Sequence, residues 1–350
     1  MIILIKVGII GATGYVGAEL LRLLLNHEAV SVEAISSVTF KDELISSVYK
    51  NFSGIVDLIC EDEDSVISKS DVIFGALPHG LSERLASKIL KYRKKFIDIG
   101  ADFRLKNEES YIKWYNKRFD YKPLHEKSIY SIPEFHRNKI IEGNYEIIAN
   151  PGCYPTSIAL GLIPAIKSNL VNEQSIIIDS KSGVTGSGRK LSLGNHFVEC
   201  NESLNAYSLG GVHRHTPEIE QIINEFSDTN VKITFTPHLV PLNRGILSTI
   251  YFDLKGEYSL KSIHKIYSKF YENEYFVKVL PLGSNAKIKD VKNSNYCNIS
   301  IHKDNRCNRC IICSVIDNMV KGAAGQAIQN MNLLMGIEEN KGLKSIATAF

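Results

Sequence analysis

Several features that would place this 350-residue chain in a specialised class are missing from its sequence. No apolar run reaches the roughly 18–20 residues that a membrane-spanning helix requires. No linker, internal repeat or low-complexity segment interrupts the chain. The net charge is only +3, which suits an anionic small molecule but is too weak and too dispersed to indicate nucleic acid. With 44% hydrophobic and 23% charged residues, the composition predicts a soluble globular protein long enough for two domains.

The seven cysteines lack the regular spacing of a disulfide framework, so we expect a reduced, cytoplasmic setting. Cys307, Cys310 and Cys313 form Cys-x-x-Cys-x-x-Cys, but the fourth cysteine and proline of a bacterial iron–sulfur motif are absent. Cys297 could complete a zinc set by distance alone. Residues 310–316 instead resemble a strand, which would direct Cys310 and Cys313 to opposite faces, so we predict no metal here.

The N-terminal segment predicts a strand, then a glycine-rich turn, then a helix, which is the order that a dinucleotide-binding site requires. Residues 1–7 are apolar apart from Lys6 and continue into the turn, so we predict a first strand (residues 5–10) rather than a signal peptide. A leucine-rich helix is expected from Ala18 to about His27. The glycines would allow a tight turn, approach to a pyrophosphate and close helix packing. The predicted cofactor-binding residues of this turn are Gly11, Thr13, Gly14, Tyr15, Val16 and Gly17.

The end of the second predicted strand, residues 30–35, bears on which dinucleotide binds. A site that prefers NAD commonly has an acid there, which holds the ribose 2′-hydroxyl. Glu33 lies inside the strand, whereas Ser36 and Ser37 follow its end and Lys41 is near in sequence. These residues suit a 2′-phosphate better, so we predict NADP with contacts from Ser36 and Ser37; a simple turn is the alternative.

Three further apolar strands are predicted at residues 71–77, 96–100 and 146–149, which implies a mainly parallel, doubly wound α/β sheet. Ligands of such sheets bind at the carboxyl ends of the strands. The loops that follow these strands supply three more candidate contacts: Pro78 for the cofactor, and Arg104 and Asn150 for the substrate.

Residues 150–156, Asn-Pro-Gly-Cys-Tyr-Pro-Thr, place Cys153 in a restricted turn just before a predicted helix. The positive end of a helix dipole favours a thiolate, which is a strong nucleophile towards an activated acyl group. A small buried cysteine in a loop is the structural alternative.

The second half predicts an α+β domain. A strand at residues 175–180 leads into a hydroxyl-rich loop, residues 182–189, that could cradle a phosphate or carboxylate through Ser182 and Arg189. A mobile surface loop is the alternative. Gly183 of this loop is assigned to the cofactor, and another clear strand is expected at residues 246–252.

A helix is predicted to start at Pro217 with Thr216 as its cap. His215 and Glu218 would lie close across its first turn, so a carboxylate could orient a histidine that carries protons. The pair His213 and His215 could also bind zinc, but no third or fourth ligand is evident nearby. Near the end of the chain, a segment rich in small residues contains Asn318 and Lys321, both assigned to the cofactor, and continues as a helix to about Leu334.

Six of these motifs, in this order, resemble the N-acetyl-gamma-glutamyl-phosphate reductase family, the arginine-biosynthesis branch of the aspartate-semialdehyde dehydrogenase superfamily. The resemblance runs essentially end to end. It rests on the glycine turn, Leu77–Gly80, Asp102–Leu105, Asn150–Thr156, His213–Glu218 and Lys321–Ala327.

The resemblance implies an NADP-binding domain over residues 1–150 that recruits residues 317–350, and a catalytic and dimerisation domain over residues 151–316. It implies Cys153 as nucleophile, His215 as acid/base and Glu218 as its orienting partner, with His213 as the alternative acid/base and otherwise a substrate contact. Val38 stands where the family often has an arginine for the 2′-phosphate, and Ser131 replaces a glycine of the family.

The reaction that the resemblance implies is an NADPH-dependent reductive dephosphorylation of N-acetylglutamyl 5-phosphate through a cysteine thioester, in a cytoplasmic homodimer or homotetramer. Its partners would be an acyl phosphate and phosphate, with no nucleic acid, membrane or metal. Aspartyl phosphate or the one-carbon-longer aminoadipyl phosphate are rival substrates, since one methylene changes binding by only ~1–3 kcal/mol. A non-catalytic cofactor-binding protein is the rival of another class.

Overall fold

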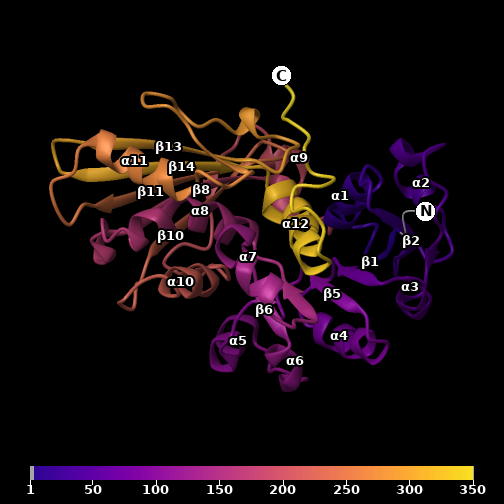
Figure 1. The fold of residues 1–350 in the computed structure, drawn as a ribbon. Helices are drawn as coiled ribbons and strands as arrows, with labels where there is room; N and C mark the ends of the chain where they lie inside the picture. Colours follow the sequence, from indigo (N-terminus) through magenta and orange to yellow (C-terminus); the bar gives the residue numbers. More distant parts are fainter. Residues whose placement is uncertain (1–3, 350) are drawn as a thin grey trace. The chain divides into compact units, whose positions relative to one another are not determined.

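A computed structural model describes residues 4–349, so the first three residues of the apolar start of the chain lie outside the described range. The described chain separates into two compact units (Figure 1). The first contains the residues up to Pro151 together with Ala323–Lys344. The second contains Gly152–Gly322 and the residues from Ser345 onward. Each unit is built on its own seven-stranded sheet.

The first unit confirms the doubly wound α/β fold, because all neighbouring strands of its sheet are parallel. Strands of such a sheet are buried on both faces, which explains their continuous apolar sequences, as in β4 and β7. In spatial order the strands are β3 (Cys60–Glu61), β2 (Val30–Ser36), β1 (Ile5–Ile10), β4 (Val72–Gly75), β5 (Lys95–Asp98), β7 (Ile147–Ala149) and β6 (Ser128–Tyr130).

Helices cover both faces of this sheet. Figure 1 shows α1 (Tyr15–Leu24) and α12 (Gly325–Leu334) on one side, and α3 (Glu63–Lys69) and α4 (Ser82–Lys91) on the other. The late helix α12 packs against α1, β5 and α7, so the end of the chain completes this unit. The remaining helices of the unit are α2 (Ile45–Val48), α5 (Glu108–Tyr115), α6 (Lys122–Glu126) and α7 (Pro133–Glu142).

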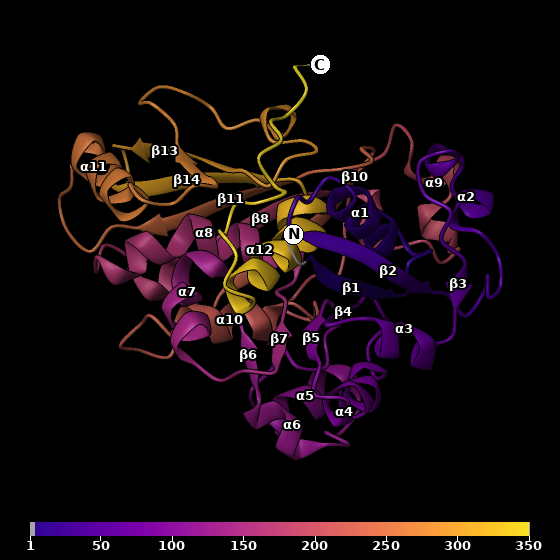
Figure 2. The same cartoon turned by 45° about the vertical axis from the view of Figure 1, so that its right-hand side comes forward.

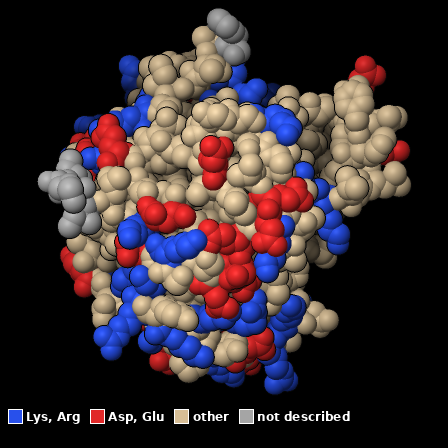
Figure 3. Space-filling model, turned by 90° about the vertical axis from the view of Figure 1, so that its right-hand side faces the viewer, with Lys and Arg blue, Asp and Glu red and all other residues tan. Residues whose placement is uncertain are grey.

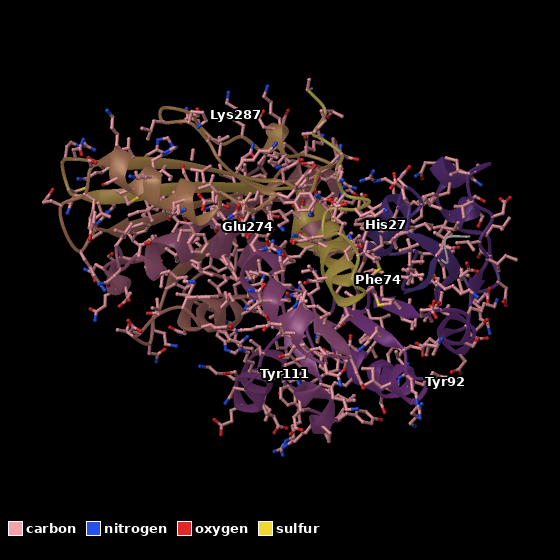
Figure 4. The ribbon with its side chains drawn as sticks, viewed as in Figure 1. His27, Phe74, Tyr92, Tyr111, Glu274 and Lys287 are labelled. Atoms are coloured by element: carbon pink, nitrogen blue, oxygen red, sulfur yellow. The ribbon has the colours of Figure 1, made fainter. Side chains whose placement is uncertain are left out.

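A buried histidine ties the end of α1 to α12. His27, labelled in Figure 4, accepts the N–H of Ala29 at Nδ1 and so carries its proton at Nε2, which lies 3.0 Å from Oδ1 of Asn332. Burial lowers the pKa of His27, which keeps the ring neutral in this arrangement. Phe74 of β4, also labelled, is fully buried in the core of the same unit.

The second unit has a mixed sheet, and its strand β11 alternates strictly between buried and half-buried residues. The buried face packs on α8 (Cys153–Lys167), while α11 (Leu260–Phe270) packs on β13 and α8. The helix and sheet approach closely at Gly161, where a Cβ atom would lie 2.7 Å from Ile250. In spatial order the strands are β12 (Val277–Val279), β13 (Cys297–Asp304), β14 (Arg309–Ile316), β11 (Ile246–Asp253), β8 (Ile177–Gly183), β10 (Thr234–Val240) and β9 (Asn205–Ala206).

Several predicted boundaries are wrong by a few residues. Helix α1 starts three residues before Ala18, and β8 runs to Gly183, so Ser182 and Gly183 belong to a strand. Helix α10 (Thr216–Asn224) begins at Thr216, with His215 in the cap position. The prediction of Thr216 as the cap is wrong: its hydroxyl is buried and has no hydrogen-bond partner among the described residues.

Over residues 4–349, none of the helices combines the length and the apolar character needed to cross a bilayer. On the face drawn in Figure 3, Lys and Arg side chains are interspersed with Asp and Glu side chains. That mixture agrees with the small net charge of the sequence.

Candidate active site

The turn between β1 and α1 has the backbone of an anion-binding loop. Gly11 has φ of +87°, and a Cβ there would lie 2.4 Å from the carbonyl oxygen of Ala76. A Cβ on Gly17 would lie 2.2 Å from the carbonyl oxygen of Gly11, so only glycine fits. Gly14 caps α1 without a side-chain hydrogen bond, and no acid occupies the first turn of the helix. The amides at this helix N-terminus therefore suit the pyrophosphate of a dinucleotide.

The hydroxyls predicted to meet a 2′-phosphate lie beside this turn. The backbone amides of Gly11 and Ala12 both donate to the carbonyl oxygen of Ser36. The side chains of Ser37 and Thr13 are hydrogen-bonded to each other, with 2.6 Å between their oxygens. Both serines are nearly buried, whereas Val38 is 94% exposed and supplies no charge. The site thus offers hydroxyls and lacks an acid at the end of β2, which fits NADP better than NAD.

The loop between β4 and α4, which contains Pro78, is held by a buried carboxylate. Asp102 accepts hydrogen bonds from the backbone amides of Gly80 and Ser82 and from the hydroxyl of Tyr111, which is labelled in Figure 4. Burial, and then the charge of Asp102, raises the pKa of Asp98 to about 7. Pro78 is therefore carried on a rigid loop at the carboxyl edge of the parallel sheet.

Two predicted substrate contacts have internal partners in the first unit. Arg104 is buried, and its guanidinium donates to the carbonyl oxygens of Asn150 and Ile99. The side-chain amide of Asn150 donates to the carbonyl oxygen of Ala323 and accepts from Asn330 of α12. These bonds fix the loop after β7, so both residues hold the backbone that leads into Cys153.

Cys153 is the first residue of α8 rather than the residue before it. The helix dipole therefore acts on its side chain directly and favours negative charge there. Gly152 caps the helix in an extended conformation, and its backbone amide donates to Oε1 of Glu218 at 2.7 Å. The side chain of Glu218 is almost fully buried, so this charged hydrogen bond connects α10 to the turn of the cysteine.

Tyr154, the residue after Cys153, belongs to a buried cluster of aromatic and histidine rings in the second unit. The ring of Tyr154 lies 5.6 Å from that of His213 and 5.9 Å from that of His215. Its hydroxyl lies 3.1 Å from the hydroxyl of Tyr207. Burial, and then Tyr207, raises the pKa of Tyr154 far above its usual range, so both hydroxyls stay protonated. Phe235 of β10 closes the cluster against Tyr154 and His213.

The two histidines of the motif differ. Nδ1 of His213 accepts the backbone amide of His215, which places the proton of the neutral ring on Nε2. Burial, with the charge of Arg214, lowers the pKa of His213 to about 4. His213 is thus a neutral ring near pH 7.

The other predicted contact residues of the second unit differ in burial and in their hydrogen-bond partners. Asn318 accepts the backbone amide of Gly245 and donates to Thr185, while Lys321 is fully buried and lies 5.7 Å from the ring of Phe276. Ser182 is buried beside Tyr154, whereas Arg189 is exposed. Gly183 lies close to the backbone of residues 243–244: a Cβ atom added to Gly183 would lie 2.8 Å from that backbone.

Cys310 and Cys313 lie on a strand of the mixed sheet, as predicted. Cys310 is buried and Cys313 is half-buried on β14, three residues apart and so on opposite faces. Cys297 is buried on the neighbouring strand β13, and Cys307 is exposed in the turn between the two strands.

Comparison with known proteins places this geometry in a family. The model described as "Semialdehyde dehydrogenase, NAD binding domain" matches residues 6–142, and "Semialdehyde dehydrogenase, dimerisation domain" matches residues 153–318. A protein of Clostridium botulinum named N-acetyl-gamma-glutamyl-phosphate reductase is 58% identical over 99% of this chain and 100% of its own length. The chain belongs to the N-acetyl-gamma-glutamyl-phosphate reductase family. Further members from Brachyspira hyodysenteriae and Halothermothrix orenii are 51% and 46% identical, over 99% and 98% of this chain and 100% and 99% of their own.

Solved structures show the same fold at low identity. Aspartate semialdehyde dehydrogenase II of Vibrio cholerae, in complex with ASA, has a TM-score of 0.73 at 16% identity and covers 95% of this chain and 99% of its own. The aspartate semialdehyde dehydrogenase of Candida albicans, solved with NADP, has a TM-score of 0.72 at 14% identity over 96% and 99% of the two chains. The family fold therefore extends to these semialdehyde dehydrogenases.

Sequence reasoning missed part of the cysteine site. Tyr154, Tyr207 and Phe235 join the two histidines from three separate segments, and no spacing rule connects them. Gly322 was also missed: a Cβ there would lie 2.8 Å from the Cβ of Cys153. The run of small residues around Gly322 was the only sequence feature that pointed to this close approach.

Proposed function

We propose that this chain reduces N-acetyl-L-glutamyl 5-phosphate to N-acetyl-L-glutamate 5-semialdehyde and phosphate, with NADPH, through a thioester on Cys153. The observation that carries the proposal is the position of Cys153 at the first residue of α8, next to Tyr154, whose ring lies 5.9 Å from that of His215. Relatives that carry this enzyme name match over the full chain.

The chemistry begins at the sulfur. The Cys153 thiolate attacks the acyl carbon, a C–S bond forms, and phosphate leaves with the electrons of the C–O bond. NADPH, when bound, supplies the hydride that converts the thioester carbonyl to a thiohemiacetal. The bond between the sulfur and the substrate carbon then breaks, which releases the semialdehyde and regenerates the free thiol of Cys153.

His215 is proposed to donate and remove the protons at the carbonyl oxygen and at the sulfur. Backbone amides of the first turn of α8 are proposed to hold the negative oxygen, because amides at a helix start have no acceptor within the helix. The Gly152 amide already donates to Glu218, so Glu218 is proposed to fix the turn in which the reaction occurs. The glycine turn of the first unit, with Ser36 and Ser37, is proposed to hold NADP.

The substrate is tested most simply in reverse, as NADPH formation from N-acetylglutamate semialdehyde and phosphate. Aspartate semialdehyde and the one-carbon-longer homologue run in parallel, with Cys153→Ala as the control. We expect phosphate-dependent activity on the N-acetyl substrate that is lost in the variant. Activity on a homologue alone would keep the mechanism and change the substrate, while a folded protein that binds NADP without any activity would refute catalysis.

The same family assignment leads us to propose a homodimer or homotetramer, because the model that covers residues 153–318 is that of a dimerisation domain. Cytoplasmic localisation is proposed from the seven free thiols together with this biosynthetic chemistry.

A further inference from the structure

A line of buried serines crosses the sheet of the second unit on the face that packs on α8. Ser180 of β8, Ser248 of β11 and Ser314 of β14 are paired in register across these three neighbouring strands. Ser157 of α8 lies against this line, and all four serines are fully buried. Figure 2 shows α8 alongside β11, and the helix contacts both β11 and β14. The interface between helix and sheet therefore contains a polar cluster, although α8 is rich in apolar residues.

The hydroxyls of this cluster are joined by hydrogen bonds. Oγ of Ser157 lies 3.0 Å from Oγ of Ser248 and 3.2 Å from the carbonyl oxygen of Ser314. Oγ of Ser248 also lies 2.8 Å from Oγ of Ser180. Apolar side chains of similar shape can replace a bonded pair of buried polar groups at little cost in stability. A fully bonded polar cluster adds something else, because it allows only one position of the helix on the sheet.

The middle of α8 is held by a second set of hydroxyls. Pro164 lies inside the helix and has no N–H, so the carbonyl oxygen of Leu160 lacks its usual donor within the helix. The hydroxyl of Tyr271 donates to that oxygen at 2.6 Å. The hydroxyl of Tyr267 donates to the carbonyl oxygen of Gly161 at 2.8 Å. Hydroxyls from α11 and the residue after it therefore fix α8 beside the break that the proline makes.

The serine cluster lies one helical turn from the cysteine. Ser157 follows Cys153 by four residues, so the two side chains lie on the same side of α8. There is little room around Cys153, because a Cβ on Gly322 would lie 2.8 Å from the Cβ of Cys153 and 3.3 Å from Ile316. Ile316 and Ser314 are two residues apart and so lie on the same face of β14. A shift of α8 along the sheet would therefore move Cys153 against the residues packed around it.

We propose that Ser157 and Tyr271 are positioning residues of the reaction, whose hydroxyls fix the axial position of α8 and thereby the sulfur of Cys153. This inference rests on the nucleophile of the proposed function. A misplacement of a reacting group by about 1 Å can lower a rate about 100-fold. A helix held by apolar contacts alone would thus give a stable protein with a poorly placed nucleophile.

The test compares Ser157→Ala, Ser248→Ala and their double variant with Ser300→Ala. Ser300 is the matched control: it is 1% exposed on the same sheet, but it pairs with Cys313, which points to the face opposite to Ser314. We expect kcat for the acyl phosphate to fall roughly tenfold or more in both single variants, with an unchanged KM for NADPH. The double variant should lose about as much as either single variant, because both changes remove the same hydrogen bond. Folded single variants that keep the kcat of Ser300→Ala would overturn the proposal.

Alkylation of Cys153 by iodoacetamide, measured by mass spectrometry over a range of pH, tests its position without the reaction. The pKa of a thiol depends on the charges and amides around it, so we expect the midpoint of labelling to move in Ser157→Ala and not in Ser300→Ala. A wild type that does not reduce the acyl phosphate would refute the proposed function, while a moved midpoint would still support the positioning role. An unmoved midpoint would refute that role.

A second variant covers a Ser157→Ala protein that does not fold. Tyr271→Phe keeps the ring and removes only the hydroxyl that donates to Leu160. We expect the same loss of kcat and the same kind of change in the labelling of Cys153. A folded Tyr271→Phe protein with the kcat and the labelling midpoint of the wild type would overturn the proposal.

Discussion

The hydrogen bond between Glu218 and the amide of Gly152 predicts a measurable cost for removing the carboxylate. Glu218 is 1% exposed and its Oε1 lies 2.7 Å from the amide nitrogen. A hydrogen bond to a charged group contributes about 1.5–3 kcal/mol, and truncation leaves both a buried donor and a cavity. We expect Glu218→Ala to lower the free energy of unfolding by about 3 kcal/mol and Glu218→Gln by about 1 kcal/mol, because glutamine keeps an acceptor oxygen.

The assay measures Tm by thermal unfolding and kcat by steady-state kinetics for the wild type and the Glu218 variants. Each kcal/mol should lower Tm by roughly 2–4 °C in a domain of this size. The matched control is Glu220→Ala on the same helix, where the carboxylate pairs with exposed Lys232 and should cost less than about 1 kcal/mol. We also expect kcat to fall in Glu218→Gln without a change in the pH profile, because Glu218 positions the turn. A Glu218→Ala protein with wild-type Tm and kcat would refute this reasoning.

Three further predictions follow from the same unit. Gly322→Ala should reduce kcat roughly tenfold or more, because the new Cβ would lie 2.8 Å from the Cβ of Cys153 and displace the nucleophile. His213 should make stability fall as the pH drops from about 6.5 to about 4, by up to about 3 kcal/mol, because the unfolded chain binds the proton first. Burial raises the pKa of Cys310 to about 12, so iodoacetamide near neutral pH should label exposed Cys307 well before Cys310, as mass spectrometry can measure.

Each of these three has a control. Gly194→Ala, where a Cβ meets nothing within 4 Å, should leave kcat unchanged, and equal losses in the two glycine variants would contradict the close approach to Cys153. His213→Gln should remove its part of the acid loss measured by urea unfolding; an identical pH dependence in both proteins would show that His213 titrates normally. Equal labelling rates at Cys307 and Cys310 in folded protein would contradict the burial of Cys310.

The parts of the fold that depend on local pattern could be predicted. Strand β1 has the predicted bounds, and β2 and β11 each extend one residue beyond theirs. Strand β5 starts one residue before its predicted start and ends two residues before its predicted end. The agreement arises because continuous apolar runs specify buried strands. The two-residue strands β3 and β9 carry too little pattern to detect. Strand β10 was missed because Pro237 stands in its middle; its carbonyl oxygen nevertheless accepts from Tyr207.

In the candidate site, too, local motifs could be predicted from the sequence and long-range contacts could not. The glycine turn and Cys153 are local motifs, so sequence alone located them. The hydrogen bond from the Gly152 amide to Glu218 is different, because it joins residues 66 positions apart in the sequence. The ring cluster around Tyr154 likewise combines residues from separate loops and strands. Long-range contacts of this kind leave no spacing in the sequence.

The most direct test of the thioester is to trap it. The acyl phosphate is mixed with enzyme in the absence of NADPH, quenched with acid and digested, and the peptide that contains Cys153 is examined by mass spectrometry. The mechanism predicts an N-acetylglutamyl adduct on Cys153, one equivalent of released phosphate, and discharge of the adduct as semialdehyde when NADPH is added before the quench. Phosphate release and semialdehyde formation that persist in Cys153→Ala, without any adduct in the wild type, would contradict the central claim.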